Sequence, residues 1–176
     1  MKHYLYYLEE RYDRETLETF VRETGMELEF LENSGNWVSF EYFNGFLEKL
    51  VQFAGSQKVI HDAAEYIIKR QALGPLYSLL IIFTLLGHPG MLYKRIEKLG
   101  ESFINTGRYS VLLKSKRKCI IKCKFFPEYK QTKYNCLSTQ SILAVVPRVW
   151  NLPSAKIKEL KCATREGDSC IYEVSW

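Results

Sequence analysis

The spacing of apolar residues predicts helices over most of the first hundred positions. Helical spacing is found in residues 13–24, 41–54, 57–71, 75–86 and 91–99. The segment 75–86 is apolar on nearly every side, which is typical of a helix that is buried all round. Between the first two helices, the alternation in 27–32 and 37–40 predicts a short β-hairpin.

From residue 107 onward the pattern becomes typical of strands. Residues 109–113 and 119–125 predict one hairpin, and residues 155–164 and 169–176 predict a second. A helix is predicted over 136–150 between them, and Pro147 should kink it or end it early. Helices in the middle with strands on both sides predict an α+β domain, in which an antiparallel sheet packs against a helical subdomain.

The composition fits one globular domain over residues 1–176, long enough to bury a core. The longest apolar stretch, 79–86, is far shorter than the roughly 20 residues that cross a bilayer, so no membrane span is expected. Five cysteines cannot all pair within the chain, and no basic and then apolar leader opens the sequence. A reducing cytoplasm is therefore the predicted location.

The distribution of charge and the composition of residues 1–12 indicate which partners the chain binds. The net charge is +5, but Lys and Arg are interspersed with Asp and Glu. The one dense basic run, 114–118, is better interpreted as a solvated hairpin turn than as a phosphate-binding patch, so no direct nucleic-acid binding is predicted. Residues 1–12 are more apolar than a solvated tail, because they include Tyr4, Leu5, Tyr6, Tyr7 and Leu8. They predict a homodimer through this segment.

Four residues between 136 and 170 have the types and spacing of metal ligands: Cys136, Glu159, Cys162 and Cys170. If the second hairpin turns near Glu166, Cys162 and Cys170 lie opposite each other, with Cβ atoms about 4.5–5.5 Å apart. With Cys136 and Glu159 they would form a closed tetrahedral shell, which indicates structural Zn²⁺. A disulfide or three unrelated buried thiols are the alternatives. Cys119 and Cys123, about 13 Å apart on one strand, are predicted to be core thiols.

This four-residue spacing, with Gly167 and Asp168 before the last cysteine, resembles the zinc-binding 4-vinyl-reductase-type domain that senses phenols in some bacterial transcription activators. More loosely, the chain is similar to the superfamily that also holds haem nitric oxide sensors (H-NOX) and TRAPP Golgi transport subunits. The resemblance implies the fold shared by these three groups and a sensory module for signal transduction or transcription regulation. It also implies an output domain, attached as a C-terminal effector or supplied by a partner.

The ligand site follows from the same resemblance. The phenol sensors have a histidine at about the distance of His88 before the first zinc cysteine, so His88 is expected to contact a small apolar ligand. The pocket is expected between the apolar segment 75–86, with Leu79, Ile82 and Phe83, and the hairpin in 107–126, because a helix apolar all round must be covered on every side. A histidine that interacts with the last carbonyls of a helix is the alternative for His88. No Trp occurs in 107–126 to hold a phenol ring, and the haem signature Tyr-x-Ser-x-Arg is not matched by residues 109–113.

No catalytic motif was found in the sequence. It contains no nucleophile elbow, phosphate loop, dinucleotide fingerprint or metalloprotease helix, so the chain is not predicted to be an enzyme. Two functions remain: a ligand-binding sensory domain, and a scaffold or assembly subunit of TRAPP-like fold without a small ligand. An internal cavity would favour the first, and a filled core beside a large exposed apolar surface would favour the second.

Overall fold

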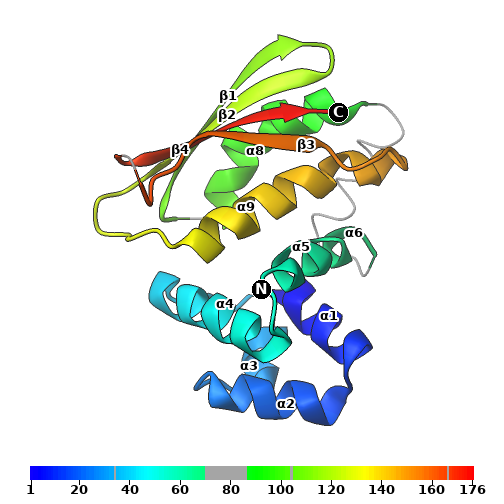
Figure 1. Ribbon diagram of the computed structural model, residues 1–176, viewed down its shortest axis with the longest axis vertical. Coiled ribbons are helices and arrows are strands. Elements are labelled where there is room, and N and C mark those ends of the chain that lie inside the picture. Colours follow the sequence, from blue (N-terminus) through cyan, green and yellow to red (C-terminus); the bar gives the residue numbers. More distant parts are fainter. Residues whose placement is uncertain (34, 70–86, 104, 166) are drawn as a thin grey trace. The chain divides into compact units, whose positions relative to one another are not determined.

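The computed structural model describes residues 1–33, 35–69, 87–103, 105–165 and 167–176. The predicted single domain forms two compact units, unit 1 (Met1–Tyr77) and unit 2 (Ser78–Trp176), and each is described by itself (Figure 1). The predicted helix 75–86, which contains Leu79, Ile82 and Phe83, lies outside the described residues. In the ranges that are described, every helix is too short or too polar to cross a bilayer.

Unit 1 is helical. Its described helices are α1 (Lys2–Arg11), α2 (Arg14–Glu23), α3 (Leu28–Glu32), α4 (Phe40–Ala54), α5 (Lys58–Ala64) and α6 (Tyr66–Lys69). Asp13 begins α2 as predicted, because its side chain accepts a 2.6 Å hydrogen bond from the Thr16 N–H. Ser39 caps α4 in the same way at 3.0 Å. Gly55 ends α4 at φ +67°, a conformation that favours glycine.

The core of unit 1 is built from aromatic and aliphatic side chains of α1, α2 and α4. Phe20 and Phe46 meet edge to face with ring centroids 5.4 Å apart, and Tyr4 packs beside Phe46 at 5.9 Å. From α1, the side chains of Tyr4, Leu5 and Leu8 are at most 2% exposed. The apolar residues that predicted a dimer are therefore largely used inside unit 1, and the homodimer itself stays a prediction.

The β-hairpin predicted over 27–40 is wrong. Residues 28–32 form α3, and residues 37–39 precede α4 without regular structure. Leu28 and Leu31 are buried while Phe30 is 37% exposed, which is the three-residue spacing of a helix rather than the alternation of a strand. In so short a segment, the sequence fits both the two-residue period of a strand and the three-to-four-residue period of a helix. The packing of Leu28 and Leu31 decides between them.

The stability of unit 1 should depend on pH through His3. Burial, and to a smaller extent the positive charge of the amino terminus, lower the pKa of His3 well below its usual 6.5. Its Nε2 atom finds no hydrogen-bond partner among the described residues. Below pH 6.5 the unfolded chain therefore binds a proton that the folded unit does not. The free energy of unfolding should fall as the pH drops, by up to about 1.4 kcal/mol per pH unit for one proton.

Urea unfolding at pH 7 and pH 5 checks this prediction. His3→Phe keeps a ring against Tyr4, whose centroid is 4.0 Å away, but it cannot titrate. The variant should lose less stability between the two pH values than the unmodified chain. Equal losses in both proteins would show that His3 is not the titrating group.

Unit 2 contains a four-stranded antiparallel sheet in the order β1-β2-β4-β3. Its described elements are α8 (Pro89–Phe103), β1 (Gly107–Ser115), β2 (Lys118–Phe125), α9 (Lys133–Val145), the 3₁₀ helix η1 (Val146–Trp150), β3 (Lys156–Lys161) and β4 (Ser169–Ser175). The two predicted hairpins are thus confirmed, and β2 pairs with β4 to join them into one sheet. The α+β prediction is confirmed.

Helices α8 and α9 pack against one face of the sheet (Figure 1). The core between them is built from Tyr93 of α8, Leu143 of α9 and the inward side chains of the strands, among them Ile121, Tyr172 and Val174. The predicted core thiols Cys119 and Cys123 belong to it, with at most 1% exposure. The opposite face of the sheet carries the outward side chains of all four strands.

Pro147 ends α9 early, as predicted, and the next turns are 3₁₀. Because proline has no N–H, Pro147 cannot donate to the Leu143 carbonyl one turn before it. The Tyr93 hydroxyl donates to that carbonyl instead, at 2.8 Å. The next carbonyl, of Ala144, accepts from the Ala155 N–H, also at 2.8 Å. Two of the last carbonyls of α9 therefore receive hydrogen bonds from outside the helix, one from α8 and one from the segment that leads into β3.

Candidate functional site

Three cysteine side chains meet in unit 2: Cys136 from the first turn of α9, Cys162 just after β3, and Cys170 near the start of β4. The Cys136 sulfur lies 3.5 Å from that of Cys170 and 3.7 Å from that of Cys162. All three thiols are free and buried, so the disulfide alternative is not formed. This thiol cluster confirms that the sequence spacing brings Cys136, Cys162 and Cys170 together.

Backbone and hydroxyl groups fix the thiol cluster in place. The Ala163 N–H donates to the Cys170 sulfur at 3.3 Å, and the Thr164 hydroxyl lies 3.0 Å from the Cys162 sulfur. Sequence reasoning missed both contacts, because they depend on how the chain turns after β3. That turn begins with a hydrogen bond from the Arg165 N–H to the Cys162 carbonyl, and Gly167 completes it at φ +75°.

The hydrogen bond between Cys136 and Cys170 moves the pKa values of these two thiols in opposite directions. Hydrogen bonding to Cys136 is the main cause that lowers the pKa of Cys170 to about 6, and the same bond, together with burial, raises the pKa of Cys136. Cys170 is therefore favoured as the thiolate of the pair. A thiolate is a nucleophile and a soft metal ligand, but Cys170 is fully buried. The cluster is closed to substrates from solvent.

Glu159 is not part of the thiol cluster. Among the described residues, the group whose ligand atoms lie within 4.8 Å of one another contains only the three cysteines. The Glu159 carboxylate instead accepts a hydrogen bond from Arg165 and a 2.9 Å bond from the Gln140 amide of α9. Neither partner was foreseen from the sequence. Gln140 can be found only once α9 is known to cover the inward face of β3.

His88 lies just before α8, at the rim of an open groove of about 360 Å³. The groove is lined by His88, Gly90, Leu113, Lys114, Ser115 and Lys116. The Nδ1 atom of His88 accepts a 3.1 Å hydrogen bond from the Gly90 N–H. A Cβ at the Gly90 position would lie 2.8 Å from the His88 ring and 3.1 Å from the Trp176 ring, so a larger residue here would displace the His88 side chain. The expected neighbours Leu79, Ile82 and Phe83 lie outside the described residues.

No protein-family model matches the chain, and no curated protein matches it. Solved structures do. An H-NOX protein from K. algicida, with unliganded Fe(II), is 14% identical with a TM-score of 0.70, covering 99% of this chain and 92% of that chain. An oxygen-binding H-NOX domain related to soluble guanylate cyclases is 6% identical with a TM-score of 0.66, covering 99% and 91%.

A third structure comes from work on haem redox potential and porphyrin distortion. It is 8% identical with a TM-score of 0.69, covering 99% of this chain and 96% of that chain. At these identities the likeness establishes the fold alone. The chain shares the fold of H-NOX domains over 99% of its length.

The structural Zn²⁺ predicted from the sequence is wrong. The solved proteins of this fold are described by their haem, Fe(II) or porphyrin rather than by zinc. The closed Cys₃Glu shell is also not formed, because Glu159 is held by Arg165 and Gln140. The described residues give the three sulfurs no fourth ligand. The spacing correctly predicts that three thiols meet, but it does not determine where the Glu159 carboxylate points.

Haem, which the fold implies, does not fit the described residues of this chain. At the position of the signature arginine stands Leu113, which is 43% exposed and cannot pair with a propionate. The His88 side chain is exposed, beside Lys114 and Lys116 rather than in an apolar cavity. Tyr109 is half-buried, and burial raises the pKa of its hydroxyl. We therefore assign no role to haem in this chain.

Proposed function

We propose that the chain is a sensory domain of the 4-vinyl-reductase type that binds a small, mainly apolar molecule in the cytoplasm and controls an output domain. The observation that carries the proposal is the fold, which matches H-NOX domains over 99% of this chain and more than nine tenths of theirs. One of those domains is described as oxygen-binding and related to soluble guanylate cyclases. The proposal gives the chain no catalytic role.

His88 is the proposed polar contact of the ligand. Two features support it: the residue follows the apolar segment 75–86, and it stands at the rim of a groove that ends on β1. The hydrogen bond from Gly90 to Nδ1 fixes the ring and favours the tautomer with a proton on Nε2. Nε2 would then donate to a hydroxyl or carbonyl oxygen of the ligand. Leu79, Ile82 and Phe83 are proposed to cover its apolar part.

A thermal-shift screen of phenols, indoles, fatty acids and quinones tests the proposal. A ligand that binds only the folded chain should stabilise it by about 2.7 kcal/mol at a hundredfold excess over Kd. His88→Ala should weaken binding of a polar-headed ligand by about 1–3 kcal/mol, because a ligand that covers His88 would lose its hydrogen-bond partner. His61→Ala, at an exposed position of α5 in unit 1, is the matched control and should leave affinity unchanged.

Two outcomes would count against this function. If none of these compounds raises the melting temperature, the scaffold or assembly interpretation replaces the sensory one. If a compound binds but His61→Ala and His88→Ala weaken it equally, the chain binds small molecules without the proposed contact.

A further inference from the structure

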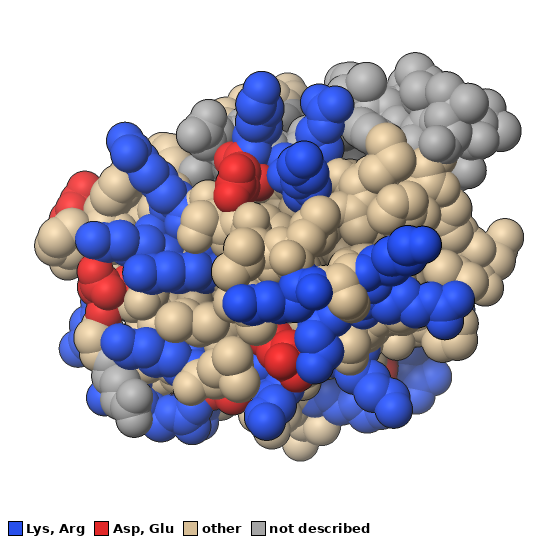
Figure 2. Space-filling model, turned by 90° about the horizontal axis from the view of Figure 1, so that it is seen from above, with Lys and Arg blue, Asp and Glu red and all other residues tan. Residues whose placement is uncertain are grey.

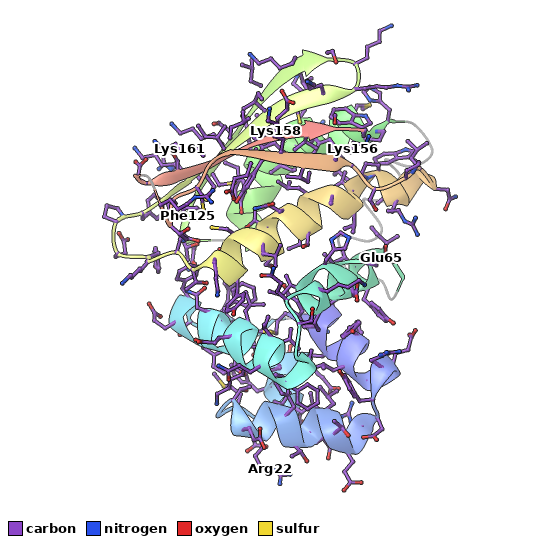
Figure 3. The ribbon with its side chains drawn as sticks, viewed as in Figure 1. Arg22, Glu65, Phe125, Lys156, Lys158 and Lys161 are labelled. Atoms are coloured by element: carbon purple, nitrogen blue, oxygen red, sulfur yellow. The ribbon has the colours of Figure 1, made fainter. Side chains whose placement is uncertain are left out.

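The face of the sheet opposite α8 and α9 is strongly cationic. Its positive side chains lie on outward positions of the strands and at the tip of the β1–β2 hairpin: Arg108, Lys114, Lys116, Arg117, Lys118, Lys122, Lys124, Lys156, Lys158 and Lys161. We call this set, with the outward apolar residues described below, the cationic face. Figure 2 shows Lys and Arg side chains spread over it, with few acidic groups between them. The three lysines of β3 lie on the side away from α9 (Figure 3).

Few of these charges are neutralised by neighbours. Two carboxylates pair on this face: Glu173 with Lys118 at 3.1 Å, and Asp168 with Lys124 at 3.3 Å. The part of the chain that the structure describes gives the other eight cations no carboxylate partner. The surplus of eight exceeds the net charge of +5 of the whole chain. The remainder of the molecule is therefore net negative, and the positive charge is concentrated here.

Apolar side chains lie among the cations. Leu112 is 56% exposed and is paired across the strands with Ile120, which is half-buried. Leu160 is 49% exposed at the irregularity in β3, and Ile171 is half-buried between Lys122 and Lys161. The cationic face is thus an amphipathic surface, with apolar groups on its two central strands and on both edge strands.

We propose that the cationic face docks on a membrane surface that carries anionic lipids. Lysine is a compact point charge suited to diffuse attraction by many headgroups, and eight of the ten cations are lysines. The exposed leucines would enter the boundary between headgroups and acyl chains, as the apolar residues of interfacial segments do. A bilayer surface offers both interactions at once, so one occupant accounts for both the charge and the apolar groups.

A nucleic acid fits this surface less well. The outward positions of the four strands carry no aromatic side chain among the described residues, so bases would find nothing to stack on. Phosphates would also leave Leu112 and Leu160 in contact with a charged backbone. Docking on lipid goes beyond the proposed sensory function and does not rest on it. The cationic face shares Lys114 and Lys116 with the groove beside His88, but the proposal uses neither His88 nor segment 75–86.

The test is binding of the full chain to phosphatidylcholine vesicles with and without phosphatidylserine. We expect binding only to the anionic vesicles, and weaker binding as salt concentration rises. Each neutralised cation should cost about fivefold in affinity, so the triple variant Lys156→Gln, Lys158→Gln, Lys161→Gln should bind roughly a hundredfold more weakly. Leu112→Ser should weaken binding severalfold without changing the salt dependence.

A second triple variant distinguishes an effect of the cationic face from an effect of the overall net charge on binding. Arg22→Gln, Lys94→Gln, Lys98→Gln removes the same number of exposed cations from α2 and α8 and should bind like the unmodified chain. Equal losses in both triple variants would overturn the proposal, as would no binding to anionic vesicles at low salt. Binding to duplex DNA or to an acidic protein, lost in the β3 variant while vesicles are not bound, would assign the face to that partner instead.

Discussion

Tyr93→Ala is expected to lower the free energy of unfolding by about 3–5 kcal/mol, the range for removing a large aromatic side chain from a core. Tyr93 is fully buried, and its ring lies 4.7 Å from that of Trp176. Its hydroxyl also supplies the hydrogen bond that Pro147 cannot give to Leu143. One substitution therefore leaves a cavity and an unpaired carbonyl, and it should loosen α8 from α9. Urea unfolding followed by circular dichroism measures the effect.

Tyr93→Phe separates the two contributions. The ring stays and only the hydroxyl is lost, so the cost should fall to about 1–3 kcal/mol for a buried acceptor left without its donor. If Tyr93→Phe is as stable as the unmodified chain, the bond to Leu143 does not hold the end of α9.

Deleting residues 1–12 is expected to unfold unit 1. The deletion removes α1, whose Tyr4, Leu5 and Leu8 are at most 2% exposed. Burial of each such side chain contributes about 1.5–3 kcal/mol. The loss of three is comparable with the total stability of a typical domain, about 5–15 kcal/mol. Circular dichroism should show loss of the helical signal of unit 1.

A change at the solvent side of the same helix serves as the control. Arg11→Ala, at an exposed position in the last turn of α1, should cost no more than about 1 kcal/mol. Light scattering distinguishes the intramolecular role from the predicted dimer. Suppose the chain without residues 1–12 stays folded and has half the molecular mass in solution of the unmodified protein. Residues 1–12 would then form an interface between copies rather than part of the core of unit 1.

Strong and long patterns in the sequence predicted most of the described elements. The alternation of β1, β2, β3 and β4, the proline at the end of α9 and the cap at Asp13 each act locally, so their consequences can be derived without knowing the fold. The approach of Cys136, Cys162 and Cys170 was also predictable, because the spacing of cysteines on a hairpin and on a neighbouring helix limits where they can lie.

What could not be predicted depends on contacts between distant segments. Residues 28–32 fit both a strand and a helix, and burial of Leu28 and Leu31 selected the helix. Glu159 has the spacing of a metal ligand, but Arg165 and Gln140 compete for its carboxylate. The cationic face was hidden for a similar reason. Its cations come from two separate stretches, 108–124 and 156–161, and they gather only when the outward positions of β1, β2 and β3 face one side.

The central claim is that the chain binds a small apolar molecule through His88. Native mass spectrometry of the full chain, purified from cells and then mixed with the compounds that shift its melting temperature, tests this most directly. We expect a complex of one chain, or one per chain in a dimer, with one small organic molecule that denaturation releases. The complex should be depleted in His88→Ala but not in His61→Ala. A spectrum that contains only the mass of the bare chain under all these conditions would contradict the account.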